Sequence, residues 1–407
     1  PTASVTTASV NNTTSVTTAQ STETGTVYLV KSGSTVTDKA SLDTLAAGDT
    51  ANSATITTAN TNTTIATTGL VDGAYKTYAV DAAGNVSAAS TNTITLDSAA
   101  PTISAVSIPN SAMKVGSAVT VSITAGEAGL SLVSGSVNGV NVTGFTDNGS
   151  GSYSATYTVA EGNTDRAAGA TIPVSFVLAD AAGNNSAAFT TAISQASDSI
   201  DANTPTTSVT TASVNNTTSV TTAQSTETGT VYLVKSGSTV TDKASLDTLA
   251  AGDTANSATI TTANTNTTIA TTGLVDGAYK TYAVDAAGNV SAASTNTITL
   301  DSAAPTAAVA TAAFSADTGS STTDLITKTA AQDLSGTYTG TIGAGETLQI
   351  SLDNGSSWTS ASTATGGNWT LTSQTLTASN TLKVRVTDTA GNSSTALSQA
   401  YILDTTA

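Results

Sequence analysis

The sequence contains no cysteine and no histidine among its 407 residues. Without cysteine it can form no disulfide and no thiolate nucleophile, and without histidine no imidazole can act as a base or bind a metal. These absences exclude whole classes of enzyme and zinc protein. Because carboxylates are then the only strong metal ligands, calcium is the ion that this composition favours.

Charged residues are scarce too, and most of them are acidic. Only 10% of the residues are charged, and 28 acidic against 11 basic residues give a net charge of -17. This balance disfavours nucleic acid and anionic lipid as partners and favours cations. No apolar run approaches the ~18 residues of a membrane span, so we expect no direct membrane insertion. No signal peptide opens the sequence, so we expect an internal part of a longer protein.

An internal repeat organises the chain. Residues 1–101 return at 205–305 with a single change, Thr207 in place of Ala3. Pro101 follows Leu-Asp-Ser-Ala-Ala just as Pro305 does, so each repeat holds two modules of ordinary domain size. We therefore predict four modules: module 1 (1–100), module 2 (101–204), module 3 (205–304) and module 4 (305–407).

The residues that are abundant predict an all-β fold. Thr, Ser, Ala, Asn and Val dominate, and short alternating runs such as 26–30 and 75–80 are separated by turn residues. This pattern is typical of immunoglobulin-like β-sandwiches. One segment, 38–48, instead shows an N-cap residue, leucines and a final Gly, which predict a short surface helix. The joints are short and carry Pro, so we expect the sandwiches to be arranged end to end as an extended, monomeric rod.

The same turn, Asp-x-Ala-Gly-Asn, precedes the last strand of every module, and another Asp follows that strand. A Glu that precedes an earlier strand should start at the same end, so we expect three carboxylates to converge at each junction and hold calcium. The candidate ligands are Glu23, Asp81 and Asp97 in module 1; Glu127, Asp180 and Asp201 in module 2; Glu227, Asp285 and Asp301 in module 3; and Asp333, Asp388 and Asp404 in module 4.

A simpler interpretation of the motif is a hairpin turn that needs no metal. Its Asp would accept local backbone N–H bonds, while Gly and Asn would adopt positive φ. Against this, unpaired carboxylates that lie close together repel one another unless a cation or a proton intervenes. The recurrence of the acids in modules of unlike sequence therefore favours the metal.

Segments 21–30, 68–76 and 78–87, together with Asp-Thr-Gly-x-Ser-x-x-Asp at 317–324, resemble the bacterial Ig-like repeats of giant RTX adhesins and biofilm-associated surface proteins. The resemblance covers essentially the whole chain. It implies secretion to the bacterial cell surface, calcium within and between neighbouring modules, and a role as the extender of an adhesive tip. It also implies Asp317 and Asp324 as calcium ligands within module 4. That module lacks the Glu-x-Gly of the others, and Asp333 is the substitute considered for the Glu.

Two other functions compete with the extender. A glycosidase would use a carboxylate pair such as Asp81 and Asp97 as acid and base, but a catalyst gains little from a copy of the pair in every module. An array of modules that bind carbohydrate or another surface directly would use Trp358 and Trp369 as stacking platforms. Burial in the core is the better expectation for tryptophans in sandwiches of this size.

Overall fold

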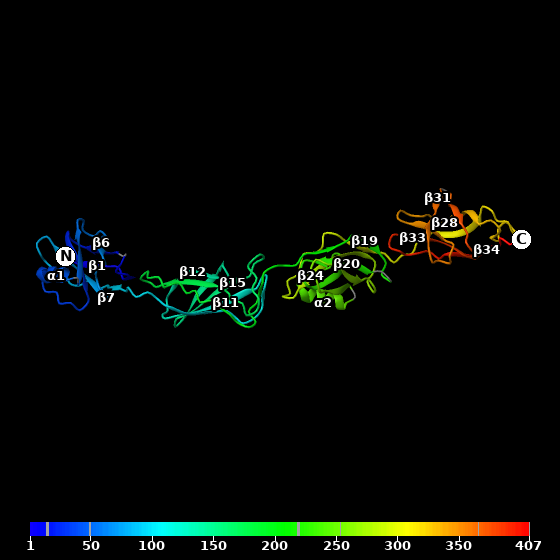
Figure 1. Ribbon diagram of the computed structural model, residues 1–407. Coiled ribbons are helices and arrows are strands. Elements are labelled where there is room, and N and C mark those ends of the chain that lie inside the picture. The colour runs from blue at the N-terminus through cyan, green and yellow to red at the C-terminus, as the bar shows by residue number, and fades with distance from the viewer. Residues whose placement is uncertain (14–15, 49, 218–219, 253, 365, 407) are drawn as a thin grey trace. The chain divides into compact units, whose positions relative to one another are not determined.

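The computed structural model describes residues 1–13, 16–48, 50–217, 220–252, 254–364 and 366–406. The chain divides into two compact units, Pro1–Asn203 and Thr204–Ala407, which are described separately below. Strands occupy both units, and the helices of the described residues are short (Figure 1). None of these helices is long and apolar enough to cross a membrane.

In unit 1, module 1 is a sandwich of two sheets. One sheet has the order β1-β3-β6 and the other β2-β8-β7-β4-β5, with all pairs antiparallel except β2 with β8. A core of apolar side chains, including Val27, Leu29 and Tyr75, fills the space between the sheets. The strands are β1 (Ala3–Val5), β2 (Ala8–Val10), β3 (Val16–Ser21), β4 (Gly25–Lys31), β5 (Ala51–Ile56), β6 (Thr63–Ala66), β7 (Gly73–Asp81) and β8 (Ile94–Leu96).

The predicted helix is present as α1 (Lys39–Ala47). Asp38 caps its N-terminus by accepting the backbone N–H of Ser41 at 2.8 Å, and Gly48 ends it. Leu42 is fully buried against the outer side of strand β4. Tyr28 donates to Asp43 Oδ1 at 2.6 Å, which ties the helix to the sheet. Strand β4 is therefore covered on both sides, which explains its continuous apolar run.

The rest of unit 1 forms a second sandwich over residues 101–203. Its main sheets have the orders β14-β15-β11-β9 and β13-β12-β16, and β10 pairs with β17 in parallel. Tyr153, Tyr157 and Phe176 are fully buried between the sheets. The strands are β9 (Ile103–Ser107), β10 (Met113–Lys114), β11 (Ala118–Ala125), β12 (Ser131–Val137), β13 (Val140–Asn141), β14 (Thr143–Gly149), β15 (Ser152–Thr158), β16 (Val174–Ala179) and β17 (Ile200–Asp201).

Unit 2 begins with module 3, which repeats the architecture of module 1. Its sheets are β18-β20-β23 and β19-β25-β24-β21-β22, with α2 (Lys243–Ala251) packed on the second sheet. The strands are β18 (Thr207–Val209), β19 (Ala212–Val214), β20 (Val220–Ser225), β21 (Gly229–Lys235), β22 (Ala255–Ile260), β23 (Thr267–Ala270), β24 (Gly277–Asp285) and β25 (Ile298–Leu300).

Module 4 completes unit 2 with sheets β26-β28-β32-β31 and β27-β34-β33-β29-β30. Trp369, Leu382 and Val384 lie in its core. The strands are β26 (Ala308–Phe314), β27 (Ile326–Thr327), β28 (Ala331–Thr339), β29 (Thr347–Ser351), β30 (Thr359–Ser360), β31 (Ser362–Ala364), β32 (Asn368–Thr375), β33 (Asn380–Thr387) and β34 (Leu397–Leu403). The predicted all-β fold of immunoglobulin-like sandwiches is confirmed.

Candidate metal site at the module ends

The recurring turn has the local chemistry of an Asp-capped hairpin. In module 2, Asp180 Oδ1 accepts the backbone N–H of Ala182 at 2.8 Å and of Asn184 at 2.9 Å. Its Oδ2 accepts the side-chain amide of Asn184 at 2.8 Å. Gly183 has a φ of 89°, whereas Asn184 is not at positive φ, so the prediction was right for the glycine and wrong for the asparagine. The metal-free interpretation thus accounts for the turn itself.

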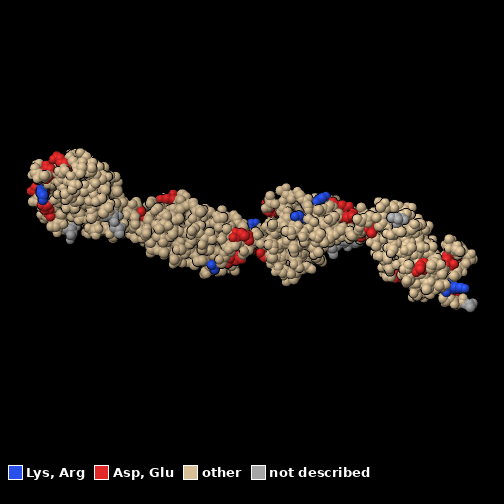
Figure 2. Space-filling model, turned by 90° about the horizontal axis from the view of Figure 1, so that it is seen from above, with Lys and Arg blue, Asp and Glu red and all other residues tan. Residues whose placement is uncertain are grey.

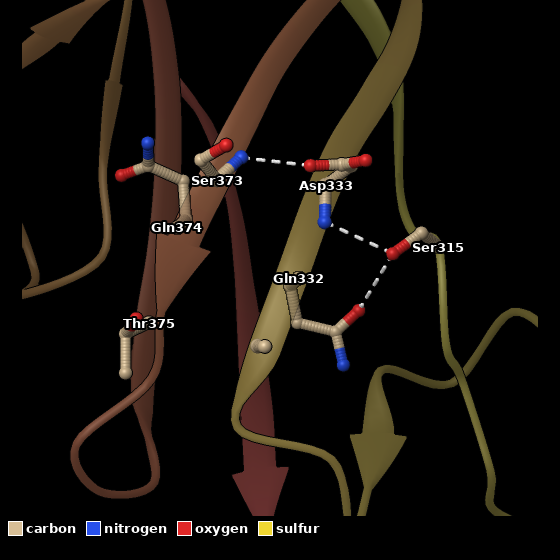
Figure 3. A pocket seen from close by; sticks show the side chains of 7 residues that line it. Ser315, Gln332, Asp333, Ser373, Gln374 and Thr375 are labelled. Carbon is tan, nitrogen blue, oxygen red and sulfur yellow. Dashed lines mark hydrogen bonds between the residues drawn. The ribbon is translucent and has the colours of Figure 1, made fainter.

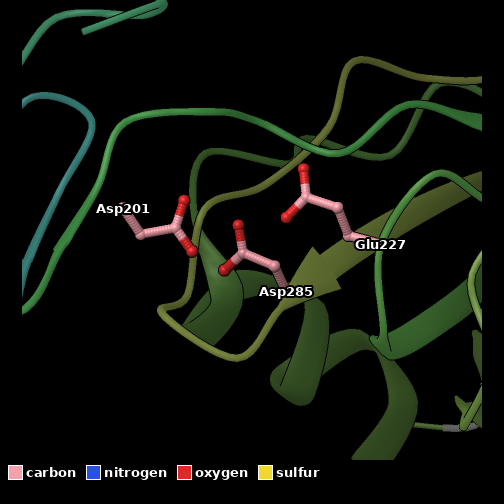
Figure 4. Close-up of side chains that lie close together, drawn as sticks. All are labelled: Asp201, Glu227 and Asp285. Atoms are coloured by element: carbon pink, nitrogen blue, oxygen red, sulfur yellow. The ribbon is translucent and has the colours of Figure 1, made fainter. Parts of the chain in front are cut away.

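Strand pairing brings the predicted Glu to the same end as this Asp. In module 1, Gly25 pairs with Asp81, and Glu23 lies two residues before Gly25. In module 3, Glu227 and Asp285 have carboxylate oxygens within 4.8 Å of each other (Figure 4). Asp285 is only 8% exposed, and its Oδ2 accepts no hydrogen bond from the described residues. A buried carboxylate oxygen without a donor is a candidate metal ligand.

The structure corrects the position of the Asp that follows the last strand. Leu96 pairs with Gly73, so Asp97 lies beside the start of strand β7, while Asp81 is at its end. The two are separated by the nine residues of that strand, about 25 Å. The reason is simple: after the turn, the chain runs back along β7 and leaves the module at the opposite end. The predicted sets Glu23–Asp81–Asp97, Glu127–Asp180–Asp201 and Glu227–Asp285–Asp301 are therefore wrong as groupings.

This separation also removes the catalytic alternative for the pair. The carboxyl groups of a glycosidase lie roughly 5–10 Å apart, flanking one bond. Asp81 and Asp97, at opposite ends of the same module, cannot act together in that way.

Within unit 1, Asp97 instead approaches the acids of the next module. Asn184, which belongs to the turn of Asp180, donates from its side chain to the carbonyl oxygen of Asp97 at 2.8 Å. Burial raises the pKa of Glu127, and the negative charges of Asp180 and Asp97 raise it further. The carboxylates that interact are therefore the exit Asp of one module and the Glu and turn Asp of the following one.

Unit 2 repeats this relation between modules 3 and 4. Asn392, in the turn of Asp388, donates to the carbonyl oxygen of Asp301 at 2.7 Å. Thr347 pairs with Thr387, so Glu346 lies directly across from Asp388. The sequence analysis did not identify Glu346 as a candidate ligand, although this residue precedes a strand much as Glu23 does. We identify it as the Glu of this set.

Asp333, the residue considered in its place, lies elsewhere. Its Oδ1 accepts the backbone N–H of Ser373 at 2.7 Å, and its own N–H donates to Ser315 Oγ at 2.9 Å (Figure 3). Ser315 follows strand β26, whose first residue is near the linker, so Asp333 is about 20 Å from the end that carries Asp388. Asp333 is therefore not a joint ligand. It lines a polar hollow of about 470 Å³ with Gln332 and Gln374 among others.

The loop with Asp317 and Asp324 is built around backbone bonds. Asp317 Oδ2 accepts the N–H of Leu325 at 3.0 Å, and Asp324 Oδ1 accepts that of Ile326 at 3.1 Å. Asp317 Oδ1 is buried and accepts no hydrogen bond from the described residues. Asp404 follows strand β34, which pairs with Ile326 and Thr327 beside this loop. Metal binding by these acids stays a prediction.

The tryptophans differ in exposure. Trp369 is 1% exposed, as predicted for a core residue, and cannot stack on a sugar. Trp358 is half-buried beneath the guanidinium of Arg385, which lies 3.9 Å from the ring centre. Burial thus removes Trp369 as a stacking platform, and Arg385 occupies one face of Trp358.

Comparison with known proteins points to the same fold. Residues 304–405 match the family model of a bacterial Ig-like domain. Among curated proteins, none matches this chain. The family match and the two-sheet architecture agree on an immunoglobulin-like sandwich for module 4.

Several solved structures resemble the chain at low similarity. Fibronectin(III)-like modules of Clostridium thermocellum CbhA are 18% identical and cover 49% of this chain and 92% of their own, with a TM-score of 0.26. The Escherichia coli adhesin FdeC is 19% identical over 75% of this chain and 96% of its own (TM-score 0.22). Bacteroides ovatus SGBP-B, solved with a mixed-linkage heptasaccharide, is 14% identical over 91% and 88% (TM-score 0.17).

The environment of Glu127 predicts a pH dependence. Because its pKa in the folded protein is raised, ionised Glu127 opposes folding at neutral pH, and this penalty is relieved as the pH falls through the folded-state pKa. Glutamate labelled with ¹³C at the side-chain carboxyl, of which the chain has five, would report the titration by NMR. We expect a Glu127 midpoint above the ordinary 4.5 in chelator, and a lower midpoint in Asp97→Asn. A midpoint that Asp97→Asn leaves unchanged would contradict the assigned cause.

Proposed function

We propose that this chain is a non-catalytic, calcium-stiffened extender of a secreted bacterial surface adhesin, which holds an adhesive tip away from the cell. The observation that supports it best is the approach of Asp97 to Glu127 and Asp180 at the junction inside unit 1. Among the described residues, no lysine or arginine forms an ion pair with any of these three acids. Their mutual repulsion favours a bound cation.

The chemistry of the set suits calcium. Calcium takes six to eight oxygens at flexible geometry, and carboxylates and backbone carbonyls are its usual ligands. An ionised carboxylate has about four lone-pair sites, so the turn Asp can accept backbone N–H bonds and still bind the ion. By the same relation of linker to following module, the proposed ligand sets are Asp97, Glu127 and Asp180 within unit 1, and Asp301, Glu346 and Asp388 within unit 2.

The surface is consistent with a spacer. In the view of Figure 2, most of the surface carries no charged side chain, and the acidic atoms gather in separate patches. The high net negative charge keeps such a chain soluble and away from nucleic acid and anionic lipid. Cations and the neighbouring modules are then its natural partners.

Calcium titration of the chelator-treated chain tests the metal. We expect binding with a Kd of ~10⁻⁴–10⁻³ M, the range of extracellular modules. At a hundredfold excess over Kd, the gain in unfolding free energy is about 2.7 kcal/mol per site. Glu127→Gln should weaken one site tenfold or more, because the Glu127 carboxylate is lost. Asp333→Asn, which removes an acid far from the joints, should leave every site unchanged.

Solution scattering tests the mechanical role. Calcium should increase the maximum dimension and narrow the spread of shapes, because it fixes the angle between neighbours. If calcium binds but leaves the scattering unchanged, the extender role fails while the metal site stands. If melting temperature and scattering are both insensitive to calcium and chelator, the metal joint is also wrong.

A further inference from the structure

The asparagine of the recurring turn makes a contact beyond its own module. Asn184 Nδ2 lies 2.8 Å from Asp180 Oδ2 and 2.8 Å from the carbonyl oxygen of Asp97, so its two amide hydrogens can serve both acceptors. Asn392 Nδ2 does the same in unit 2, with Asp388 Oδ2 at 2.9 Å and the carbonyl oxygen of Asp301 at 2.7 Å. Each turn thus holds the exit segment of the preceding module.

A second asparagine bonds in the opposite direction. Asn11 of module 1 is 6% exposed, and its Nδ2 donates to the carbonyl oxygen of Ala182 in the turn of module 2 at 3.4 Å. Asn215 of module 3 is 7% exposed and donates to Ala390 in the turn of module 4 at 3.3 Å. The turn therefore both donates to the preceding module and accepts from it.

We propose that the Asp-x-Ala-Gly-Asn turn is a docking receptor for the segment by which the chain leaves the preceding module. The turn recognises this segment through the main-chain carbonyl of its Asp, which is Asp97 in unit 1 and Asp301 in unit 2. Amide and carbonyl groups are its only components, so the contact forms without calcium. Its partner is a strand end of the Leu-Asp type, as found in Leu96–Asp97 and Leu300–Asp301.

Two features strengthen this assignment. Modules 2 and 4 have unlike sequences, yet both receive the preceding module with the same pair of bonds, so the contact belongs to the turn motif rather than to one interface. The two turns also share one conformation, with Gly183 and Gly391 both at a φ of 89°, and a Cβ on either would lie at ordinary van der Waals distance from the asparagine of the preceding module, 3.8 Å from Asn11 Nδ2 and 3.6 Å from Asn215 Nδ2.

Module 1 provides a matched control. Its turn has the same internal bonds, with Asn85 Nδ2 donating to Asp81 Oδ2 at 2.7 Å. The hydrogen bonds of Asn85 in the described residues stay within its own turn. Replacing Asn85 therefore measures the local cost of losing the turn asparagine, separately from docking.

The test uses spin-label distances in the full chain with chelator present. The protein has no cysteine, so Ala40→Cys and Thr120→Cys place one label on an exposed residue of each module of unit 1. We expect a narrow distance distribution in this background. Asn184→Ala should at least double its width, and Asn11→Ala, which leaves the turn intact, should broaden it to a smaller extent.

Each outcome decides the proposal. Broadening by Asn184→Ala and Asn11→Ala but not by Asn85→Ala supports the receptor. Equal widths for Asn184→Ala and the unsubstituted background would overturn it, as would equal broadening by Asn85→Ala. A background distribution that is already broad in chelator and narrows only with calcium would also overturn it, because the metal would then be what holds the modules.

Discussion

Gly25→Ala is expected to unfold module 1 under conditions in which the rest of the chain stays folded. Gly25 has a φ of 149°, and a Cβ placed there would lie 2.0 Å from the carbonyl oxygen of Val80. The backbone has little room to move, because Gly25 pairs with Asp81 of β7 on one side and with Ile56 of β5 on the other. Strain and overlap together should cost at least about 3 kcal/mol of unfolding free energy.

Gly33→Ala is the matched control for this effect. Gly33 also has a positive φ, 91°, but a Cβ there would meet nothing within 4 Å. It should therefore show only the backbone cost, ~1–2 kcal/mol. Calorimetry can follow both variants, because the nearly identical module 3 is an internal reference in the same chain. If module 1 of Gly25→Ala still melts together with module 3, the close approach at Gly25 is wrong.

Trp369→Ala should destabilise module 4 by ~3–5 kcal/mol, the cost of removing a large aromatic side chain from a packed core. The ring is 1% exposed and packs with Leu334 and Leu348. It also covers Gly336, where a Cβ would come within 2.6 Å of the indole. The cavity that Trp369→Ala leaves would therefore lie beside the paired strands β28 and β32. These strands cannot move to fill it without breaking their backbone pairing.

Trp358→Ala is the comparison, because this ring is half-buried and contacts the guanidinium of Arg385. Its loss should cost about 1 kcal/mol. The chain has two tryptophans, both in module 4, so the one that remains in each variant reports the unfolding of that module by fluorescence. Similar denaturant midpoints for the two variants would show that Trp369 is not a core residue in solution.

The fold could be predicted from the sequence because its signals are local. The alternation at 75–80 correctly predicts strand β7, and the N-cap Asp38 with the final Gly48 correctly predicts helix α1. The sequence also predicts correctly that Glu23 and Asp81 lie at the same end of the module. In an antiparallel pair, one strand begins where its neighbour ends.

The composition of the candidate metal site could not be derived from the sequence in the same way. The prediction that Asp97 lies at the end that carries Asp81 is wrong, because the strand that follows the turn exits at the other end of the sandwich. Glu346 is not singled out by its sequence, because only strand register, and not spacing along the chain, shows that it faces Asp388 and that Asp333 does not. The sequence predicts only a turn role for Asn184, because its second acceptor, the carbonyl oxygen of Asp97, belongs to a different module.

Asn184 and Asn392 donate to a main-chain carbonyl of the preceding module, and this has a consequence for how such proteins evolve. Every amino acid carries a main-chain carbonyl, so the residues after Asp97 and Asp301 can drift without loss of that bond. Gene segments that encode whole modules can then be duplicated or exchanged by recombination, and the new neighbours still fit. The near-perfect copy of residues 1–101 at 205–305 is what a recent event of this kind would leave behind.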